Sequence, residues 1–418
     1  MQLKSFTKNE IMYRKDKNLT VETILQPVQL GPITLRNPII KAATSEGRSP
    51  EGKVTQALID FHRGFIIGGI GMTTLAYCAI SEEGFAAPGE ILMVKENISG
   101  LKKFTEAMHE AGGKASAQLG HAGPVATKKI TGVRPIAPSR FFNLTSMQLC
   151  RAITQSEMEQ IKIQFADAAE VAVKAGFDAI ELHFGHLYLV SSFFSPWLNK
   201  RTDEYGGSIE NRTRFAKEIL LAVKERVQNQ LAIIVKLSMD DGIKGSIWLE
   251  ESTETARILD ETGVVDAFEL TMGSSVSNQM YLFRGETDID GMAATQKGIM
   301  KLGVKWFGRR ILGEYPYRDL YMLESARQFQ TVVKKAKLIL LGGINTFEHI
   351  ARAKQEGFSM VAMGRALLRE PDSIEKMRKN PHQAGLCIHC NKCMFSVYST
   401  TNCVFTKNYA TTSHVAIF

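Results

Sequence analysis

Two histidines and a tyrosine stand close together after an apolar run: His183, His186 and Tyr188 follow or end the segment AIELHF. Side chains of these types can ligate a metal ion, or they can be hydrogen-bonded core residues. They can also act on a substrate, with the histidines donating hydrogen bonds to an oxygen and the tyrosine donating a proton. Because the motif lacks the glutamate of a zinc-protease helix and an evident third ligand, it argues against zinc and leaves the other two uses open.

Glycines mark the ends of two later apolar runs, LILLGG and SMVAMGR. Gly342, Gly343 and Gly364 could simply allow tight turns, or their backbone N–H groups could bind a phosphate. Arg365 follows the last of these glycines and adds a charged donor that suits phosphate oxygens. The combination favours a phosphate site.

Four of the six cysteines crowd the C-terminal segment. Cys387, Cys390, Cys393 and Cys403 have the spacing C-x2-C-x2-C-x9-C. Thiols clustered in this way in a reducing compartment are candidates for an iron–sulfur or zinc site, because thiolates ligate both. A tail of reduced cysteines without metal is the alternative, so the metal stays unassigned.

Eight short apolar runs alternate with longer segments of helical periodicity. The runs are residues 37–44, 69–77, 114–120, 178–184, 231–238, 264–271, 337–343 and 358–364. A helix over 154–176 is indicated by the capping-box pair Thr154 and Glu157, and a helix over 345–357 by Asn345 at its start. Eight strands with helical crossovers predict an α/β fold, a (β/α)8 TIM barrel, since a doubly wound sheet would need fewer strands and a glycine-rich first turn.

In such a barrel the reactive groups gather at the C-terminal ends of the strands. The residues that stand there are Thr44, Ala76, Tyr77, Gln118, His121, His183, His186, Tyr188, Lys236, Gly342, Gly343, Gly364 and Arg365. This set is poor in carboxylates, which glycosidases and barrels that bind divalent metals require. We therefore expect a site that works by hydrogen bonding and phosphate binding.

The chain of 418 residues has a formal net charge of +8, and its lysines and arginines are spread along the whole length. Spread charge is typical of a solvated surface rather than of a nucleic-acid-binding patch. The N-terminal segment has no apolar run of the length that signal peptides or membrane spans need. We therefore expect a cytoplasmic protein that binds neither nucleic acid nor membranes.

Three stretches in combination resemble the Old Yellow Enzyme family of FMN-dependent ene-reductases. They are SAQLGHAG at 116–123, the long block over 181–215, which is the most specific, and the segment over 340–372. The resemblance implies a (β/α)8 barrel with non-covalent FMN that NADH or NADPH reduces. We accordingly expect an N-terminal extension over 1–26, an FMN-binding barrel over 27–380 and a cysteine-containing tail over 381–418.

The resemblance also implies roles for single residues. Thr44 would lie near the flavin carbonyl O4, Gln118 would bond the pyrimidine edge, and Lys236 would stand beside N1 and O2, where a cation stabilises the reduced ring. The implied cofactor-binding set is Lys41, Ala42, Ala43, Thr44, Ala76, Gln118, Lys236, Gly343, Gly364 and Arg365.

By the same resemblance, His183 and His186 would hold the carbonyl oxygen of an α,β-unsaturated substrate, and Tyr188 would give a proton to its α-carbon. Two donors on that oxygen stabilise the enolate that forms as hydride arrives from flavin N5. A phenol, with an unperturbed pKa of about 10, stays protonated at neutral pH and can act as a general acid. Leu187 stands where the family usually has glycine, and its branched side chain restricts the turn between the pair and the tyrosine.

The sequence therefore predicts an FMN-dependent oxidoreductase that transfers hydride from NAD(P)H through flavin N5 to an activated C=C bond. The expected partners are NAD(P)H and an enone-type molecule, and the sequence leaves open whether the chain forms a homo-oligomer. Two alternatives remain: a phosphate-binding aldolase or isomerase that uses Lys236 chemically, and a flavin- or metal-binding redox sensor that works through the C-terminal cysteines. The cysteine segment resembles the cluster segment of 2,4-dienoyl-CoA reductases, although its second and third cysteines are spaced differently.

Overall fold

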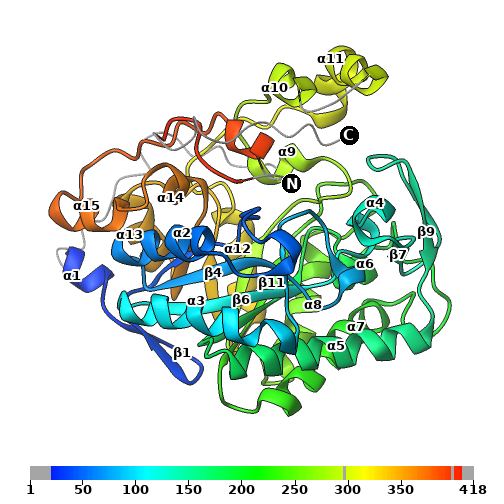
Figure 1. Cartoon of the computed structure of the whole chain (residues 1–418), viewed down its shortest axis with the longest axis horizontal. Coiled ribbons are helices and arrows are strands. Elements are labelled where there is room, and N and C mark those ends of the chain that lie inside the picture. The colour runs from blue at the N-terminus through cyan, green and yellow to red at the C-terminus, as the bar shows by residue number, and fades with distance from the viewer. Residues whose placement is uncertain (1–19, 295–297, 397–399, 407–418) are drawn as a thin grey trace, which may run out of the picture.

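Eight parallel strands close into a barrel in the computed structural model, which describes residues 20–294, 298–396 and 400–406 (Figure 1). They are β3 (Ile39–Lys41), β4 (Met72–Ala79), β6 (Lys114–Gly120), β10 (Ala179–Phe184), β11 (Ala232–Ser238), β12 (Ala267–Thr271), β13 (Lys337–Leu340) and β14 (Met360–Met363). The ring is closed because β3 pairs with both β14 and β4. The predicted (β/α)8 TIM barrel is confirmed: seven of the predicted runs contain one of these strands, and the run over 69–77 overlaps β4, which continues to Ala79.

Helices follow the strands and surround the barrel. They are α2 (Gln56–Ile67), α3 (Ile98–Glu110), α5 (Gln155–Lys174), α7 (Ile209–Val227), α8 (Leu249–Glu261), α12 (Leu323–Val332), α13 (Phe347–Gln355) and α14 (Arg365–Arg369). Helix α5 begins with the predicted capping box, in which Thr154 and Glu157 each accept the other's backbone N–H. The predicted cap of α13 was wrong: Thr346, in extended conformation, accepts the N–H of His349, and Asn345 is not the cap.

A hairpin of β1 (Val28–Leu30) and β2 (Ile33–Leu35) closes the N-terminal end of the barrel. Leu30 and Leu35 are fully buried against the inward-facing residues at the starts of the strands. Gly31, at the hairpin turn, has a φ of +50°, and a Cβ there would lie 2.6 Å from the Asp266 carboxylate. The hairpin therefore seals this end, so that the opposite end is the one that can hold a site. The part of the predicted extension over residues 1–19 lies outside the described ranges, and the part that follows includes α1 (Val21–Ile24).

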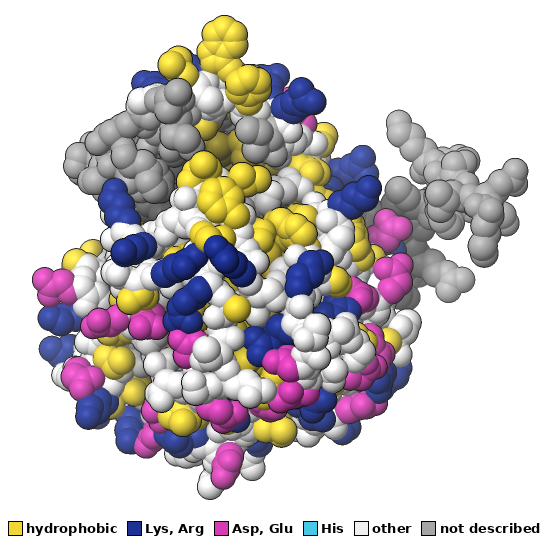
Figure 2. All heavy atoms as spheres, turned by 90° about the vertical axis from the view of Figure 1, so that its right-hand side faces the viewer, with side chains coloured by type: hydrophobic (Ala, Val, Ile, Leu, Met, Phe, Trp, Pro, Cys, Tyr) yellow, Lys and Arg dark blue, Asp and Glu magenta, His cyan; other side chains and the backbone are white. Residues whose placement is uncertain are grey.

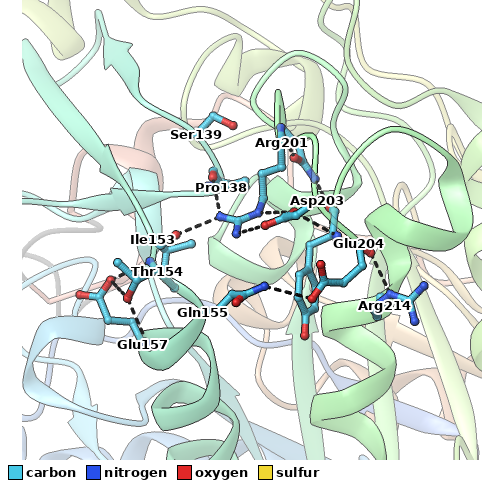
Figure 3. Close-up of polar contacts among 12 residues, drawn as sticks. Pro138, Ser139, Ile153, Thr154, Gln155, Glu157, Arg201, Asp203, Glu204 and Arg214 are labelled. Carbon is cyan, nitrogen blue, oxygen red and sulfur yellow. Dashed lines mark hydrogen bonds and ion pairs between the residues drawn. The ribbon is translucent and has the colours of Figure 1, made fainter.

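The loops after β6 and β10 build the rim of the open end. Between β6 and α5 lie α4 (Lys128–Thr131) and a small sheet of β7 (Ile136–Ala137), β8 (Phe141–Asn143) and β9 (Gln148–Ala152), and after β10 comes α6 (Leu189–Phe194). Figure 3 shows how Arg201 joins these parts: it pairs with Asp203 and donates to the carbonyl oxygens of Pro138 and Ile153, at 3.2 and 2.9 Å. The charged loop after α6 thus shapes the rim. A two-residue strand, β5 (Ile91–Leu92), extends the pairing of β4 at its C-terminal end.

The longest excursion from the barrel lies between β12 and β13 and contains α9 (Gln279–Phe283), α10 (Ile289–Ala294) and α11 (Gly298–Leu312). Figure 1 shows α10 and α11 projecting beyond the barrel, near the C-terminal segment that follows α15 (Ser373–Lys379). Trp306 of α11 is 80% exposed, and Figure 2 shows hydrophobic side chains gathered at this projecting end. Helix α9 packs onto the barrel mouth, because Tyr281 and Leu282 lie against Gly242 and Gly273. Across the described ranges, no helix combines the length and apolarity that a membrane crossing needs.

Candidate active site

The strand ends bring the predicted residues together around the open end of the barrel. Residues on β3, β4, β6, β10, β11 and β14 stand on neighbouring strands of one closed sheet. At the seam, the N–H of Ala42 donates to the carbonyl of Met363 at 2.9 Å. A Cβ on Gly364 would lie 3.8 Å from Thr44 Cγ2, so the ends of β3 and β14 meet as the cofactor prediction requires.

His183, His186 and Tyr188 form one aromatic group at the end of β10. The rings of His183 and Tyr188 stack with their centroids 4.4 Å apart, and the His186 ring meets His183 edge-on at 5.1 Å. Tyr77 of β4 completes the group, 5.4 Å from Tyr188. Nδ1 of His183 is buried and has no hydrogen-bond partner within the described part of the chain. This nitrogen is therefore available to a ligand.

The turn that carries His186 uses a backbone conformation that favours glycine. His186 and Leu187 both have a φ of +59°. The N–H of His186 donates to Ser238 Oγ and its Nε2 lies 2.9 Å from Thr271 Oγ1, while the Leu187 side chain is fully buried. These contacts offset the roughly 1–2 kcal/mol that a left-handed conformation costs a residue with a Cβ. Leu187 thus does not prevent the turn, and the contacts with β11 and β12 fix the orientation of the His186 side chain.

Both histidines are electrically neutral in this setting. Burial lowers the pKa of His186 to about 3, and the positive charge of Lys236 acts in the same direction. Burial also lowers the pKa of His183 well below its usual value, helped by His186 and Lys236. A neutral imidazole has one N–H donor and one acceptor nitrogen. Each ring can therefore donate one hydrogen bond, and neither can serve as the proton source at neutral pH.

Lys236 lies inside the barrel between two glutamates that sequence analysis missed. Its ammonium bonds to Glu269 and lies 3.3 Å from Glu181 Oε1, which also accepts from Gln118 Nε2 at 2.6 Å. The expectation of a site poor in carboxylates was wrong, because two fully buried carboxylates contact Lys236. The two-residue alternation of a strand could have found Glu181, because it points inward like His183.

These charges decide the protonation states around Lys236. Burial lowers the pKa of Lys236, but the two carboxylates outweigh this and raise the pKa above its usual value. Burial and the charge of Glu269 raise the pKa of Glu181 to about 7. Lys236 is thus a charged ammonium, and its charge is largely balanced by its neighbours.

Lys41 has a different role from the one its place on β3 suggests. Its side chain is fully buried behind the strand, where Nζ donates to Thr44 Oγ1 at 2.7 Å and lies 3.5 Å from Glu46. Glu46 also accepts the N–H of Ala76, at 3.2 Å from each oxygen, and contacts His62 Nε2 at 3.1 Å. Only the backbone of Lys41 is therefore left for a cofactor. The Lys41–Glu46 pair joins two predicted flavin contacts, Thr44 and Ala76, and sequence analysis missed Glu46 and His62.

The ends of β13 and β14 have the features of the predicted phosphate site. Gly343 has a φ of +73°, and a Cβ there would lie 2.5 Å from the backbone nitrogen of Leu320. Arg365 begins α14, whose first N–H groups have no acceptor within the helix. Its Nη1 donates to the carbonyl of Arg284 at 3.0 Å and to the side chain of Asn391. The glycine, the start of the helix and the arginine together fit the phosphate of FMN. At the end of β10, the buried and unpaired Nδ1 of His183 is available to a ligand.

The C-terminal cysteines lie beside this phosphate site. Cys387, Cys390, Cys393 and Cys403 line one pocket together with Arg365. All four are free thiols, and burial raises the pKa of Cys393 to about 12. Among the described residues, no three or more His, Cys, Asp or Glu side chains are arranged to hold a metal ion. The iron–sulfur or zinc site therefore stays a prediction, and we derive no chemistry from it.

Comparison with known proteins identifies the family of this chain. The family model described as NADH:flavin oxidoreductase / NADH oxidase matches residues 23–278. The 4,4'-dithiodibutanoate disulfide reductase of Rhodococcus erythropolis is 44% identical over 382 residues, which are 91% of this chain and 94% of that protein. A metal reductase of Desulforamulus reducens is 30% identical over 378 residues, 90% of this chain but only 52% of that protein.

Among solved structures, the old yellow enzyme homologue from Zymomonas mobilis superposes with a TM-score of 0.71 at 22% identity, over 91% of this chain and 97% of that one. This likeness agrees with the barrel described above. The family match covers more than half of the sequence and includes the strands that carry His183, Gln118 and Lys236. The chain therefore belongs to the NADH:flavin oxidoreductase / NADH oxidase family and is a flavin-dependent NAD(P)H oxidoreductase.

Proposed function

We propose that the protein uses NAD(P)H and FMN to reduce an α,β-unsaturated carbonyl compound bound against His183, His186 and Tyr188. The observation that carries this proposal is the stacked pair of His183 and Tyr188, in which a neutral, buried imidazole has an unpaired Nδ1 next to a phenol. Bound FMN would supply hydride transfer, which no side chain provides. It would be held by the strand ends and the phosphate site of the barrel over residues 27–380.

The side chains divide the remaining chemistry. His183 and His186 hold the carbonyl oxygen and stabilise the negative charge that grows on it, since preorganised neutral donors in a buried site do this at little reorganisation cost. Tyr188 gives a proton to the α-carbon. In total NAD(P)H and one proton are consumed, the C=C bond becomes a C–C bond with two new C–H bonds, and NAD(P)+ leaves.

A disulfide is the second candidate acceptor. It is supported by the 44% identity to a protein whose name states a disulfide reductase activity. In that reaction NAD(P)H and one proton convert one disulfide into two thiols and NAD(P)+. The reacting S–S bond carries no carbonyl oxygen, so the histidine pair has no oxyanion to stabilise. The two acceptors therefore differ in their need for His183 and His186.

The two alternatives from the sequence fit less well. An aldolase or isomerase that uses Lys236 needs a neutral amine, whereas its pKa is raised by two buried carboxylates. A redox sensor that works through the C-terminal cysteines has no use for the arrangement of His183, His186 and Tyr188. Both alternatives remain outcomes of the following experiment.

Anaerobic stopped-flow absorbance of the purified protein tests the proposal. We expect the flavin bands to bleach with NADH or NADPH and to return with cyclohexenone. The double variant His183→Ala/His186→Ala should keep its FMN and its bleaching by NAD(P)H, but it should lose at least roughly 100-fold in the rate of reoxidation by the enone. His382→Ala, which removes an exposed histidine of the C-terminal segment, is the matched control.

Three results would change the assignment. Recovery of the bands with 4,4'-dithiodibutanoate but not with enones would replace the alkene by a disulfide. Bleaching without recovery by either compound would favour the redox sensor. A protein that stays colourless in excess FMN would return the question to the aldolase or isomerase.

A further inference from the structure

Arg284 is caged by three tyrosines at the end of α9. Its guanidinium carbon lies 5.1 Å from the ring centre of Tyr281, 5.9 Å from that of Tyr315 and 5.4 Å from that of Tyr321. These residues come from segments about forty positions apart, which only the fold brings together. A cation over aromatic faces is attracted by their negative ring centres, so the cage holds the guanidinium in one place.

The cage is itself fixed by hydrogen bonds. Asn278 donates to the Tyr315 hydroxyl at 2.9 Å, and Tyr321 donates to the carbonyl of Leu282 at 2.9 Å. The rings of Tyr281 and Tyr315 also meet edge to face, with their centres 5.2 Å apart. Arg284 is therefore a preorganised cation and not a flexible surface side chain.

Within the described ranges, the side chain of Arg284 makes no hydrogen bond to another residue. Its Nε is buried, and no ion pair joins this side chain to another residue in that part of the chain. The acidic group facing it is Asp240, whose carboxylate already accepts the N–H of Gly242 at 3.0 Å and the hydroxyl of Tyr281. Arg284 is half-buried and its buried Nε lacks an acceptor, so an oxyanion at this position would gain both a charge and an unused donor.

Its position relates this cation to the proposed substrate. Helix α9 follows β12, the strand whose Thr271 bonds to His186, and it packs over the ends of β11 and β12. The carbonyl of Arg284 accepts from Arg365, which places Arg284 next to the phosphate site as well. Arg284 thus lies at the barrel mouth between the two functional regions.

We propose that Arg284 binds a carboxylate of the electron-accepting substrate, so that the enzyme prefers acidic acceptors; this inference rests on the function proposed above. A guanidinium matches a carboxylate with two parallel N–H donors. The tyrosine rings around it offer an apolar wall to the alkyl chain that carries the carboxylate. A phosphate of FMN or NADPH is also an oxyanion and could pair with a guanidinium. A phosphate dianion, however, is bound best by several donors, and Gly343, Gly364 and Arg365 offer these to the phosphate of FMN.

Calorimetric titration of the FMN-loaded enzyme with decanedioate tests this without any turnover. Decanedioate has the length of 4,4'-dithiodibutanoate but no reducible bond, and decane-1,10-diol is its uncharged counterpart. We expect the wild type to bind the dicarboxylate more tightly than the diol. Arg284→Gln should weaken decanedioate binding roughly 10- to 100-fold, as expected for one charge-assisted contact, and leave diol binding unchanged. Arg309→Gln is the control, because Arg309 is 76% exposed on α11.

The controls separate the sources of the oxyanion and the two proposals. Equal decanedioate affinity in the wild type and Arg284→Gln would overturn the inference, as would equal binding of diol and dicarboxylate by the wild type. A loss of FMN affinity, or of NADPH affinity alone, in Arg284→Gln would assign the arginine to a phosphate. If Arg284→Gln does not fold, Arg284→Lys, which keeps the charge but loses the fork, should show a smaller loss of decanedioate affinity. Failure to reduce enones and disulfides would sink the proposed function but leave this binding result standing.

Discussion

At the scale of single residues, the site separates hydrogen-bond donation from proton donation. Burial holds His183 and His186 neutral, with the pKa of His186 lowered to about 3, so neither carries a spare proton near pH 7. The phenol of Tyr188 stacks on His183 and is the acid beside the pair, whereas the hydroxyl of Tyr77 donates to the carbonyl of Gly84 at 3.2 Å. This division has a consequence that depends on the acceptor.

Replacing Tyr188 by phenylalanine should discriminate between the two acceptor classes. Protonation of a carbon needs a general acid, so Tyr188→Phe should slow enone reoxidation of the reduced enzyme by roughly 100-fold. A thiolate, with a thiol pKa of about 8.5, leaves a disulfide without such help. The rate of reoxidation by 4,4'-dithiodibutanoate should therefore fall by less than about tenfold. Stopped-flow absorbance measures both rates, and Tyr205→Phe, on the loop after α6 where the hydroxyl contacts Glu218, is the control. An unchanged enone rate would mean that another group delivers the proton.

Residue identities at the strand ends could be predicted because each follows an apolar run in the sequence. Glu181 and Glu269 were accessible by the same alternation, but an isolated glutamate in a strand does not reveal that it points at Lys236 until the neighbouring strand is placed. Arg284 could not be predicted at all. Its tyrosine cage exists only after the excursion between β12 and β13 has folded back on itself.

At the scale of elements, the ends of β3 and β4 are joined by buried charges. Lys41 on β3 contacts Glu46, and Glu46 accepts the N–H of Ala76 on β4. His62 of α2 contacts the same carboxylate, so three elements meet there. Because Thr44 and Ala76 are the predicted flavin contacts, the network sets the spacing of one wall of the predicted cofactor site.

Removing one charge from this network should harm both folding and flavin binding. Lys41→Met leaves Glu46 buried without its lysine, which typically costs about 3–5 kcal/mol. The double variant Lys41→Met/Glu46→Gln removes both charges and should recover part of the loss. Denaturant unfolding and FMN titration of the wild type, the single variant and the double variant measure the effect. Equal loss in the single and double variants would show that packing, and not charge, holds these strand ends together.

The barrel strands were predictable as elements because their runs are apolar and buried, with β6 beginning and ending at the predicted residues. Local backbone detail was less so. The turn at His186 and Leu187 takes a positive φ that neither residue favours, and contacts from β11 and β12 impose it. Similarly, Asn345 looked like a cap, but Thr346 is the residue whose side chain accepts the N–H of His349 in the first turn of α13.

At the scale of the whole molecule, buried ionisable groups of opposite kinds make stability depend on pH in two directions. Burial lowers the pKa of His121 to about 4 and of His186 to about 3. Burial also raises the pKa of Asp241 to about 7 and of Glu90 to about 8. The histidines resist protonation in the folded state, whereas these carboxyl groups resist losing their protons.

The signs of these two effects place a broad stability maximum between about pH 4.5 and pH 6.5. Below about pH 6.5 the unfolded histidines take up protons that the folded ones refuse, so the free energy of unfolding falls as the pH falls. Above about pH 4.5 the unfolded carboxyl groups lose protons that the folded ones keep, so the free energy of unfolding falls as the pH rises, until about pH 8. Between these limits the effects oppose each other, and outside them each acts alone.

Chemical denaturation between pH 4 and pH 9 in saturating FMN should therefore give a free energy of unfolding that is nearly constant between about pH 4.5 and pH 6.5 and declines on both sides. Glu90→Gln tests the alkaline side, because a neutral amide cannot lose a proton. Between pH 5 and pH 8 the free energy of unfolding of the variant should rise relative to that of the wild type by at least about 2 kcal/mol, since each unit of pKa shift is worth about 1.4 kcal/mol. Glu250→Gln, at an exposed position in the first turn of α8, should give a curve parallel to that of the wild type. A Glu90→Gln curve that also runs parallel to the wild type would mean that the Glu90 carboxyl is ionised in the folded barrel.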